Sequence, residues 1–173
     1  MNALTPSTLI LVADDDLEDR MLIEDAFKES RLSNPLEFVV DGEDLLDYLH
    51  RRNGYSDPSA SPRPGLILLD LNMPRKDGRE ALKEIKSDPE LRQIPIVVMT
   101  TSKVEEDILR TYDLGVNSFI TKPVTFAGLV EVMSMLTEYW FELVELPAAH
   151  NTGRLRYPSP PHRPQFETAT QRP

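Results

Sequence analysis

The chain of 173 residues contains no cysteine, which excludes a disulfide framework and a thiolate zinc site. Its three histidines, His50, His150 and His162, have no metal-ligand spacing, so we expect no zinc. Basic residues are also scarce, since 19 Lys and Arg stand against 29 Asp and Glu and leave a net charge of −10. Without a basic stripe to neutralise phosphates, we expect no nucleic-acid binding, proteins as partners and a cation as cofactor.

Long apolar runs are absent as well. No stretch approaches 18 apolar residues, and the opening MNALTPST has neither the basic region nor the apolar segment of an export signal. We therefore expect no membrane insertion and a cytoplasmic location. The length suits one domain of about 120 to 150 residues with a tail.

Short apolar runs alternate with helical patterns, which is typical of an α/β protein with a parallel sheet. Five runs predict strands, at 9–13, 36–40, 66–70, 96–100 and 118–121. Amphipathic spacing predicts helices at 17–30, 42–52, 79–87, 103–114 and 126–146. For the fourth of these helices we expect Ser102 as N-cap and Gly115 as C-cap.

Two proline-rich segments interrupt this alternation. Residues 53–65 contain three prolines and predict a flexible surface insertion, distant from the carboxyl end of the third strand. Residues 147–173 contain six prolines, which excludes helix and sheet and favours a disordered or partner-docked tail. We therefore assign residues 1–146 to one domain, with its core at 8–146, and residues 147–173 to a Pro-rich tail.

Charged side chains follow the strands where each ends. Asp14, Asp15 and Asp16 follow the first apolar run, Asp70 closes the third, and Lys122 follows the fifth. The carboxyl edge of a parallel sheet is where such folds bind ligands, and Mg²⁺ takes oxygen ligands that Asp15 and Asp70 can supply. Alternatively, the three successive acids cap the next helix. Capping does not explain Asp70, which has no helix directly after it, although a lone strand-end aspartate can also be a turn residue.

Four motifs together resemble the receiver domain of bacterial two-component response regulators. They are VADDD at 12–16, LLDLNMPRKDG at 68–78, IPIVVMTTS at 94–102 and FITKP at 119–123. The resemblance covers nearly all of residues 9–146. It implies a flavodoxin-like receiver fold, a doubly wound five-stranded parallel sheet in the order 2-1-3-4-5.

The resemblance also implies roles for the acidic residues. The aspartate that matches Asp70 accepts a phosphoryl group from a kinase phosphohistidine and is a carboxylate nucleophile. Mg²⁺ is held by Asp15, Asp70 and the backbone carbonyl of Asn72, with Asp14 acting through water, and neutralises the charge of the transferred group.

Three further residues match the family at the ends of the last two strands. Lys122 pairs with a phosphoryl oxygen or, before phosphorylation, with Asp70, and its bond to Pro123 is expected to be cis. Thr100 bonds the phosphoryl group, and Phe119 then turns into the space that Thr100 leaves, which repacks the surface formed by 103–114, 118–121 and 126–146. Taken alone, Thr100 also fits strand propensity and Phe119 also fits the core.

The last predicted helix carries two apolar stripes, whereas packing on one sheet buries a single stripe. One stripe consists of Phe126, Leu129, Met133, Leu136, Trp140 and Val144. The other consists of Val132, Met135, Tyr139, Leu143 and Leu146. The second stripe needs another partner, and we expect a homodimer there because Tyr is a typical interface anchor. The alternative is that the tail folds back over it.

The resemblance implies a single-domain response regulator that takes phosphate from a sensor histidine kinase and signals through protein contacts. Its motifs are similar to those of regulators that work with phytochrome-type kinases, so a bacteriophytochrome is a candidate kinase. Such a protein phosphorylates and dephosphorylates itself and is not a turnover enzyme. The alternatives are a phosphate sink, a pseudo-receiver scaffold, or a Mg²⁺-dependent phosphohydrolase, which the Asn at position 72 disfavours because such enzymes carry a second Asp there.

Overall fold

Five parallel strands form the centre of the computed structural model, in the order β2-β1-β3-β4-β5. They are β1 (Ile10–Ala13), β2 (Leu36–Val39), β3 (Leu66–Leu69), β4 (Ile96–Thr100) and β5 (Ser118–Thr121). The structure describes residues 8–101 and 105–143. Every residue of β1, β3 and β4 is buried, as the continuous apolar runs of doubly covered strands require. The predicted fold class and strand order are confirmed.

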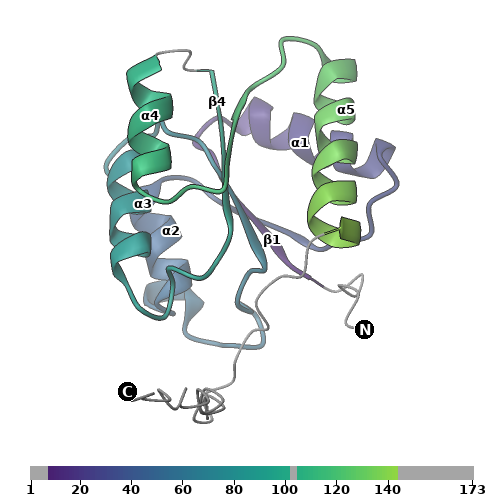
Figure 1. Cartoon of the computed structure of the whole chain (residues 1–173). Helices are drawn as coiled ribbons and strands as arrows, with labels where there is room; N and C mark the ends of the chain where they lie inside the picture. Colours follow the sequence, from purple (N-terminus) through teal and green to yellow (C-terminus); the bar gives the residue numbers. More distant parts are fainter. Residues whose placement is uncertain (1–7, 102–104, 144–173) are drawn as a thin grey trace, which may run out of the picture.

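Helices cover both faces of the sheet (Figure 1). They are α1 (Leu17–Glu29), α2 (Gly42–Leu49), α3 (Gly78–Ser87), α4 (Glu105–Asp113) and α5 (Phe126–Thr137). Alternate residues of a strand point to opposite faces, so Ile10 and Val12 pack with α1 and α5, whereas Leu11 packs with α2 and α3. The two layers leave the carboxyl edge of the sheet open to loops.

Aspartates begin the helices next to this edge. The N-caps of α1, α2 and α3 are Asp16, Asp41 and Asp77, and each side chain accepts hydrogen bonds from backbone N–H groups of the first turn. At the end of α4, Gly115 has a φ of +89° and its N–H donates to the carbonyl of Tyr112, which confirms the predicted C-cap. The predicted N-cap Ser102 lies outside the described residues.

The proline-rich segment at 53–65 packs against α2. It contains the 3₁₀ turn η1 (Asn53–Tyr55), and the ring of Tyr55 lies 5.0 Å from that of Tyr48. The Tyr55 hydroxyl donates to Asp44 at 2.8 Å and the Tyr48 hydroxyl donates to the carbonyl of Pro62 at 3.0 Å. The insertion is therefore anchored by its tyrosine and its backbone, features that proline content alone does not predict.

Helix α5 is followed directly by the π-helical segment η2 (Glu138–Leu143). Of the stripe expected to face the sheet, Leu129, Met133, Leu136 and Trp140 are buried. Phe126 is 44% exposed, so its placement in that stripe was wrong: as the first residue of α5 it lies beyond the end of β5. Val144, Leu146 and the tail at 147–173 lie outside the described residues. Nowhere in residues 8–101 and 105–143 is a helix long and apolar enough to cross a membrane.

Candidate functional site

Strand register brings the acidic residues together at the carboxyl edge of the sheet. Ala13 and Leu69 are partners in the β1–β3 ladder, so Asp14 and Asp70 follow side by side, and the N–H of Asp70 donates to the carbonyl of Ala13 at 2.9 Å. One carboxylate oxygen from each of Asp14, Asp15 and Asp70 lies within 4.8 Å of the others. Asp14 is 2% exposed and Asp70 is 7% exposed, whereas Asp15 is exposed.

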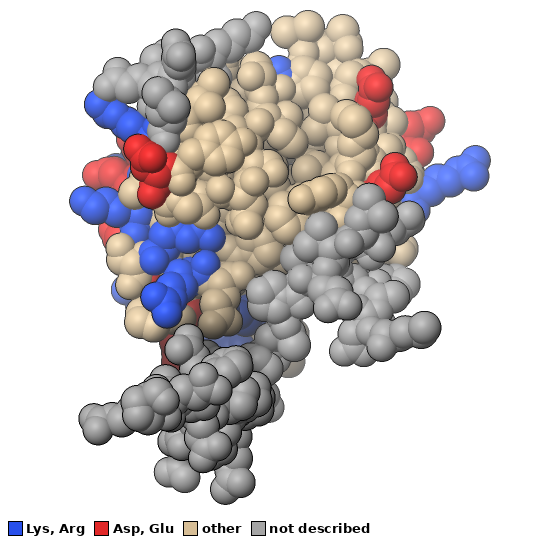
Figure 2. Space-filling model, in the orientation of Figure 1, with Lys and Arg blue, Asp and Glu red and all other residues tan. Residues whose placement is uncertain are grey.

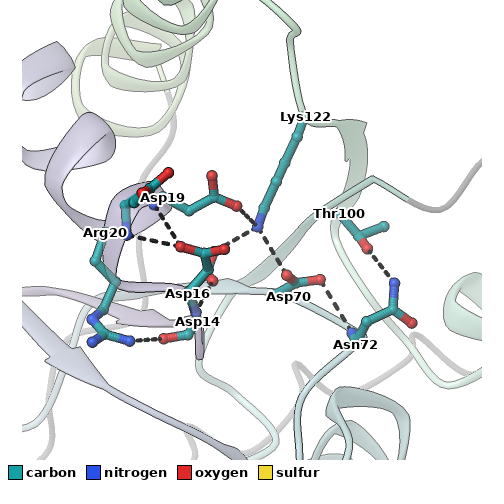
Figure 3. Close-up of polar contacts among 9 residues, drawn as sticks. Asp14, Asp16, Asp19, Arg20, Asp70, Asn72, Thr100 and Lys122 are labelled. Carbon is teal, nitrogen blue, oxygen red and sulfur yellow. Dashed lines mark hydrogen bonds and ion pairs between the residues drawn. The ribbon is translucent and has the colours of Figure 1, made fainter.

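Lys122 reaches into this cluster from the end of β5 (Figure 3). Its Nζ atom donates to Asp14 at 2.6 Å, to Asp19 at 2.7 Å and to Asp70 at 2.8 Å. Burial alone would lower the pKa of Lys122, but its hydrogen bonds to the three carboxylates outweigh this effect and raise the pKa. The ammonium group is therefore charged throughout the physiological range.

The backbone at Lys122 corrects one expectation. Every peptide bond of the described residues is trans, so the cis bond expected between Lys122 and Pro123 was wrong. The Lys122 N–H donates to the carbonyl of Thr100 at 2.8 Å, which continues the pairing of β5 with β4 beyond Thr121. From that fixed position the long side chain reaches Asp70 with the trans isomer, which is the favoured form by about 0.5–1 kcal/mol.

The three successive aspartates divide into two functions. Asp16 caps α1 through hydrogen bonds from the N–H groups of Glu18 at 2.8 Å and Asp19 at 3.3 Å. Asp14 instead points to Lys122 and also accepts from the N–H of Asp16 at 3.0 Å. Burial raises the pKa of Asp14, and the nearby Lys122 offsets this effect only in part. The capping interpretation is thus correct for Asp16 and does not account for Asp14.

Asn72 and Thr100 lie on the other side of Asp70. The Asn72 N–H donates to Oδ1 of Asp70 at 3.2 Å, and its side-chain amide lies 3.5 Å from the hydroxyl of Thr100 (Figure 3). Thr100 ends β4 and is fully buried. Phe119, in the middle of β5, is partly buried against the core on the α2–α3 face. The structure thus brings Thr100 to the cluster and leaves Phe119 in the adjoining layer.

The chain turns tightly after Asp70 to enter α3. Gly78, the first residue of α3, donates its N–H to the carbonyl of Leu71 at 2.9 Å. A Cβ atom at position 78 would lie 2.1 Å from the carbonyl oxygen of Asp70 and 2.8 Å from the Cα of Leu71. Only glycine fits this approach without displacing the backbone of Asp70, so Gly78 is required at this turn for a steric reason.

The donor set of the cluster suits a hard divalent cation. Asp14, Asp15, Asp19 and Asp70 contribute four carboxylates and Lys122 one ammonium group, which leaves three negative charges in excess. Carboxylate oxygens are the ligands that Mg²⁺ prefers, and ligands 2.0–2.1 Å from the ion lie about 3 to 4 Å from one another. The observed spacing needs only slight closure to match, so the residues fit a Mg²⁺ or Mn²⁺ ion.

Asp19 was missed by the sequence reasoning although its carboxylate contacts Lys122. The signal was its position in the first turn of α1, directly after the three successive aspartates at the end of β1. Arg20, its neighbour, donates to the carbonyl of Asp14 at 2.6 Å. The first turn of α1 therefore contributes one side chain that contacts Lys122 and one that contacts the backbone of Asp14.

The fold and the site together define a doubly wound parallel α/β domain with an acidic cluster and a lysine at the switch point between β1 and β3. The family model of the response regulator receiver domain matches residues 10–134. The chain belongs to this family.

Known relatives support the assignment. Response regulator Rcp1 of Synechocystis sp. is 41% identical over 144 residues, which cover 83% of this chain and 96% of that protein. The crystal structure of the phosphorylated cyanobacterial phytochrome response regulator RcpA is similar with a TM-score of 0.76 and 41% identity, over 82% of this chain and 99% of that one. The crystal structure of the Mn²⁺-bound form of Rcp1 is similar with a TM-score of 0.74 and 40% identity, over 82% of this chain and 99% of that one. The predicted resemblance to phytochrome-associated regulators is confirmed.

Proposed function

We propose that this chain is a response regulator whose Asp70 accepts a phosphoryl group from a sensor histidine kinase in the presence of Mg²⁺. The observation that carries the proposal is the contact between Lys122 and Asp70, at 2.8 Å, beside an acidic cluster that fits a divalent cation. A carboxylate at a strand end, a cation site and a fixed ammonium group are the parts that phosphoryl transfer to an aspartate requires.

The transfer has a simple balance. An oxygen of Asp70 attacks the phosphorus of a phosphohistidine, the P–N bond breaks, and its electron pair stays on the imidazole nitrogen, which takes up a proton. The Asp70 side chain is nearly buried but its edge of the sheet is open, so a donor can reach it in line. Lys122, now held by Asp14, Asp19 and Asp70, can exchange its contact with Asp70 for one with a phosphoryl oxygen.

Asp14, Asp15, Asp70 and the backbone carbonyl of Asn72 would hold the cation. When bound, Mg²⁺ neutralises charge on the oxygens of the phosphoryl group. Without a cation, the excess negative charge of the site opposes the arrival of a dianion. Water attack on the acyl phosphate returns Asp70 to its carboxylate, so the protein resets itself and does not turn over an external substrate.

Thr100 and Phe119 are the proposed readout of phosphorylation. The buried Thr100 hydroxyl is next to Asn72, on the side of Asp70 away from Lys122. A phosphoryl group on Asp70 offers it a charged acceptor, which is stronger than a neutral one. Movement of Thr100 toward that acceptor would open space for Phe119, which is only partly buried. Since Phe119 has no hydroxyl, the signal is a change of packing.

The surface that this change reaches is the proposed homodimer interface. Figure 2 shows that the face on which α4 and α5 lie consists mostly of uncharged residues, with charged side chains toward its margins. Exposed on these helices and on η2 are Tyr112, Met135 and Tyr139, at 49%, 55% and 52%. Exposed aromatic and methionine side chains, with charged residues toward the rim, are typical of a protein interface. Size-exclusion chromatography with light scattering tests the dimer, and a monomer before and after phosphorylation would contradict it.

The kinase that we propose as partner is of the phytochrome type. The support is the similarity to RcpA, a phytochrome response regulator, and to Rcp1, at about 41% identity over almost their full length. We also propose residues 1–146 as the receiver unit that this kinase engages, with residues 147–173 as an appended tail.

Intact-mass spectrometry tests the central proposal. The full chain is incubated with acetyl phosphate and Mg²⁺ and compared with Asp70→Asn and with a control, Asp25→Asn, whose side chain is 61% exposed on α1 and pairs only weakly with Lys28, at 3.6 Å. Wild type and the control should gain one phosphoryl group and Asp70→Asn should gain none. Equal gain by Asp70→Asn would show that Asp70 is not the acceptor.

The same experiment separates the alternatives. A pseudo-receiver scaffold would take up no phosphate. The complete set of Asp14, Asp15, Asp70, Thr100 and Lys122 argues against such a degenerate site. A phosphate sink takes phosphate without changing its α4–β5–α5 surface, so its oligomeric state and its Phe119 environment would not respond.

A further inference from the structure

A buried carboxylate ties the loop after Asp70 to the first turn of α2. Asp41 is 2% exposed, and its Oδ1 atom accepts the N–H groups of Glu43 and Asp44, both at 2.9 Å. Its Oδ2 atom accepts Nε of Arg75 at 2.6 Å and a second hydrogen bond from Nη2 of the same guanidinium group. A buried charge needs this degree of pairing, and the two-pronged geometry fixes the direction of the arginine.

The backbone of the loop is constrained at the same place. Arg75 has a φ of +63°, in the left-handed region that is unfavourable for residues with a Cβ atom. The carbonyl of the next residue, Lys76, accepts the N–H of Gly42 at 2.9 Å, and a Cβ at Gly42 would lie 2.5 Å from that oxygen. The Asp41–Arg75 pair therefore holds a strained turn in close contact with the start of α2.

This loop is the one that carries Asn72. It starts at Leu71, immediately after Asp70, and ends where Gly78 donates its N–H to the carbonyl of Leu71. Asn72 donates its N–H to Asp70 and reaches Thr100 with its amide. The loop is thus closed at its base by Gly78 and fixed at its middle by Arg75, so a change at Arg75 is transmitted to Asn72 through two residues of backbone.

We propose that Asp41 and Arg75 are positioning residues that set the affinity of the Asp14–Asp15–Asp70 cluster for a divalent cation by holding Asn72 in place. The inference rests on the proposed function, in which the carbonyl of Asn72 is a cation ligand. Neither residue touches the reacting atoms. Their pairing acts on the site through the loop. In other metal sites, residues that hydrogen-bond to the metal ligands orient those ligands in the same way.

Two substitutions separate the pairing from its structural surroundings. Asp41→Asn keeps a side-chain oxygen for the N-cap, at which Asn and Asp are equally good, and removes the charge that Arg75 meets. Arg75→Asn removes the guanidinium and places at that position a residue that tolerates positive φ. The matched control is Arg52→Gln, because Arg52 is 57% exposed like Arg75 and pairs with Asp47 at 3.1 Å near the other end of α2.

Binding of Mn²⁺ to the full chain, followed by the electron paramagnetic resonance signal of free Mn²⁺, measures the effect directly. Asp41→Asn and Arg75→Asn should each weaken binding by about tenfold. The double variant should bind no more weakly than either single variant, because both remove one interaction. Arg52→Gln should stay within about twofold of wild type. Amide hydrogen exchange should be faster at Gly42 and Gly78 in both single variants and unchanged in the control.

The proposal is overturned if both variants bind Mn²⁺ as tightly as wild type, even where their thermal stability falls, because the pair would then be structural only. It is also overturned if wild type binds no Mn²⁺ or if the two effects add in the double variant. Acetyl-phosphate labelling of the same wild-type sample separates the two proposals. Labelling at Asp70 with unchanged Mn²⁺ affinities removes only the positioning role, whereas Mn²⁺ binding without labelling removes only the proposed function.

Discussion

The approach of Gly78 to the backbone of Asp70 makes a steric prediction about the site. In Gly78→Ala the new Cβ would lie 2.1 Å from the Asp70 carbonyl oxygen, 2.8 Å from the Leu71 Cα and 3.0 Å from the Asp70 carbonyl carbon. All three neighbours are backbone atoms, so no side-chain rotation relieves the overlap. The loop and Asp70 must separate by about 1 Å, with loss of the hydrogen bond from Gly78 to Leu71.

The cost follows from known overpacking effects. Inserting a methyl group into a tight site lowers the free energy of unfolding by about 1–3 kcal/mol. Replacing glycine by alanine also reduces the entropy of the unfolded chain, which offsets this loss by up to about 1 kcal/mol. Because the clash is with backbone, we expect Gly78→Ala to lower the free energy of unfolding by about 2 kcal/mol and the Tm by roughly 4–8 °C. Displacement of the Asp70 carboxylate should slow labelling by acetyl phosphate by roughly ten- to hundredfold.

Gly54→Ala is the matched control, because a Cβ at Gly54 would meet nothing within 4 Å. Its free energy of unfolding should lie within about 0.5 kcal/mol of that of wild type, and it should take up phosphate at the wild-type rate. Urea unfolding gives the stability and intact-mass time courses give the labelling rate. If Gly78→Ala matches Gly54→Ala in both measurements, the steric account of the loop is refuted.

Three further predictions concern the cap, the cluster and a buried phenol. Asp16→Ala should cost about 1 kcal/mol in urea unfolding because α1 loses its N-cap, whereas Asp16→Asn should cost much less; equal losses would contradict the capping role. Lys122→Met leaves Asp14 and Asp70 without their shared ammonium group and should cost about 3–5 kcal/mol in EDTA, with partial recovery in Mg²⁺; wild-type stability in EDTA would contradict this. Burial raises the pKa of Tyr48 to about 12, so the unfolded chain ionises this phenol first, near pH 10. The contribution of the neutral Tyr48 phenol to the free energy of unfolding is therefore intact below pH 10, and about 2–3 kcal/mol of it is lost as the pH rises to 12. Tyr48→Phe should lack that loss, and parallel stability profiles of the two proteins would contradict the assignment.

Much of the site follows from the ends of the strands. Five apolar runs predict five strands, and in a parallel sheet their carboxyl ends share one edge, so Asp14, Asp70, Thr100 and Lys122 had to approach one another once the strand order was known. The order itself came from family resemblance, because periodicity does not say which strands are neighbours. The helix start at Asp16 could be predicted for a local reason, since capping depends on three or four consecutive residues.

Other contacts depend on relations that a sequence does not display. The contact of Asp19 with Lys122 joins residues 103 positions apart and needs the direction of the first turn of α1. The pairing of Asp41 with Arg75 needs a positive φ at an arginine, which residue type disfavours. Phe126 has the spacing of the buried stripe but lies past the end of the sheet, so periodicity places it wrongly. These features arise from tertiary position.

Chemical trapping of the phosphorylated residue tests the central claim most directly. Borohydride reduces an aspartyl phosphate to homoserine, and peptide mass spectrometry after treatment with acetyl phosphate and Mg²⁺ shows where this occurs. Homoserine should be found at position 70, and Asp14 and Asp15 should remain aspartate. Homoserine at position 14 or 15 with none at 70, or none in the chain, would contradict the assignment of Asp70 as the phosphoryl acceptor.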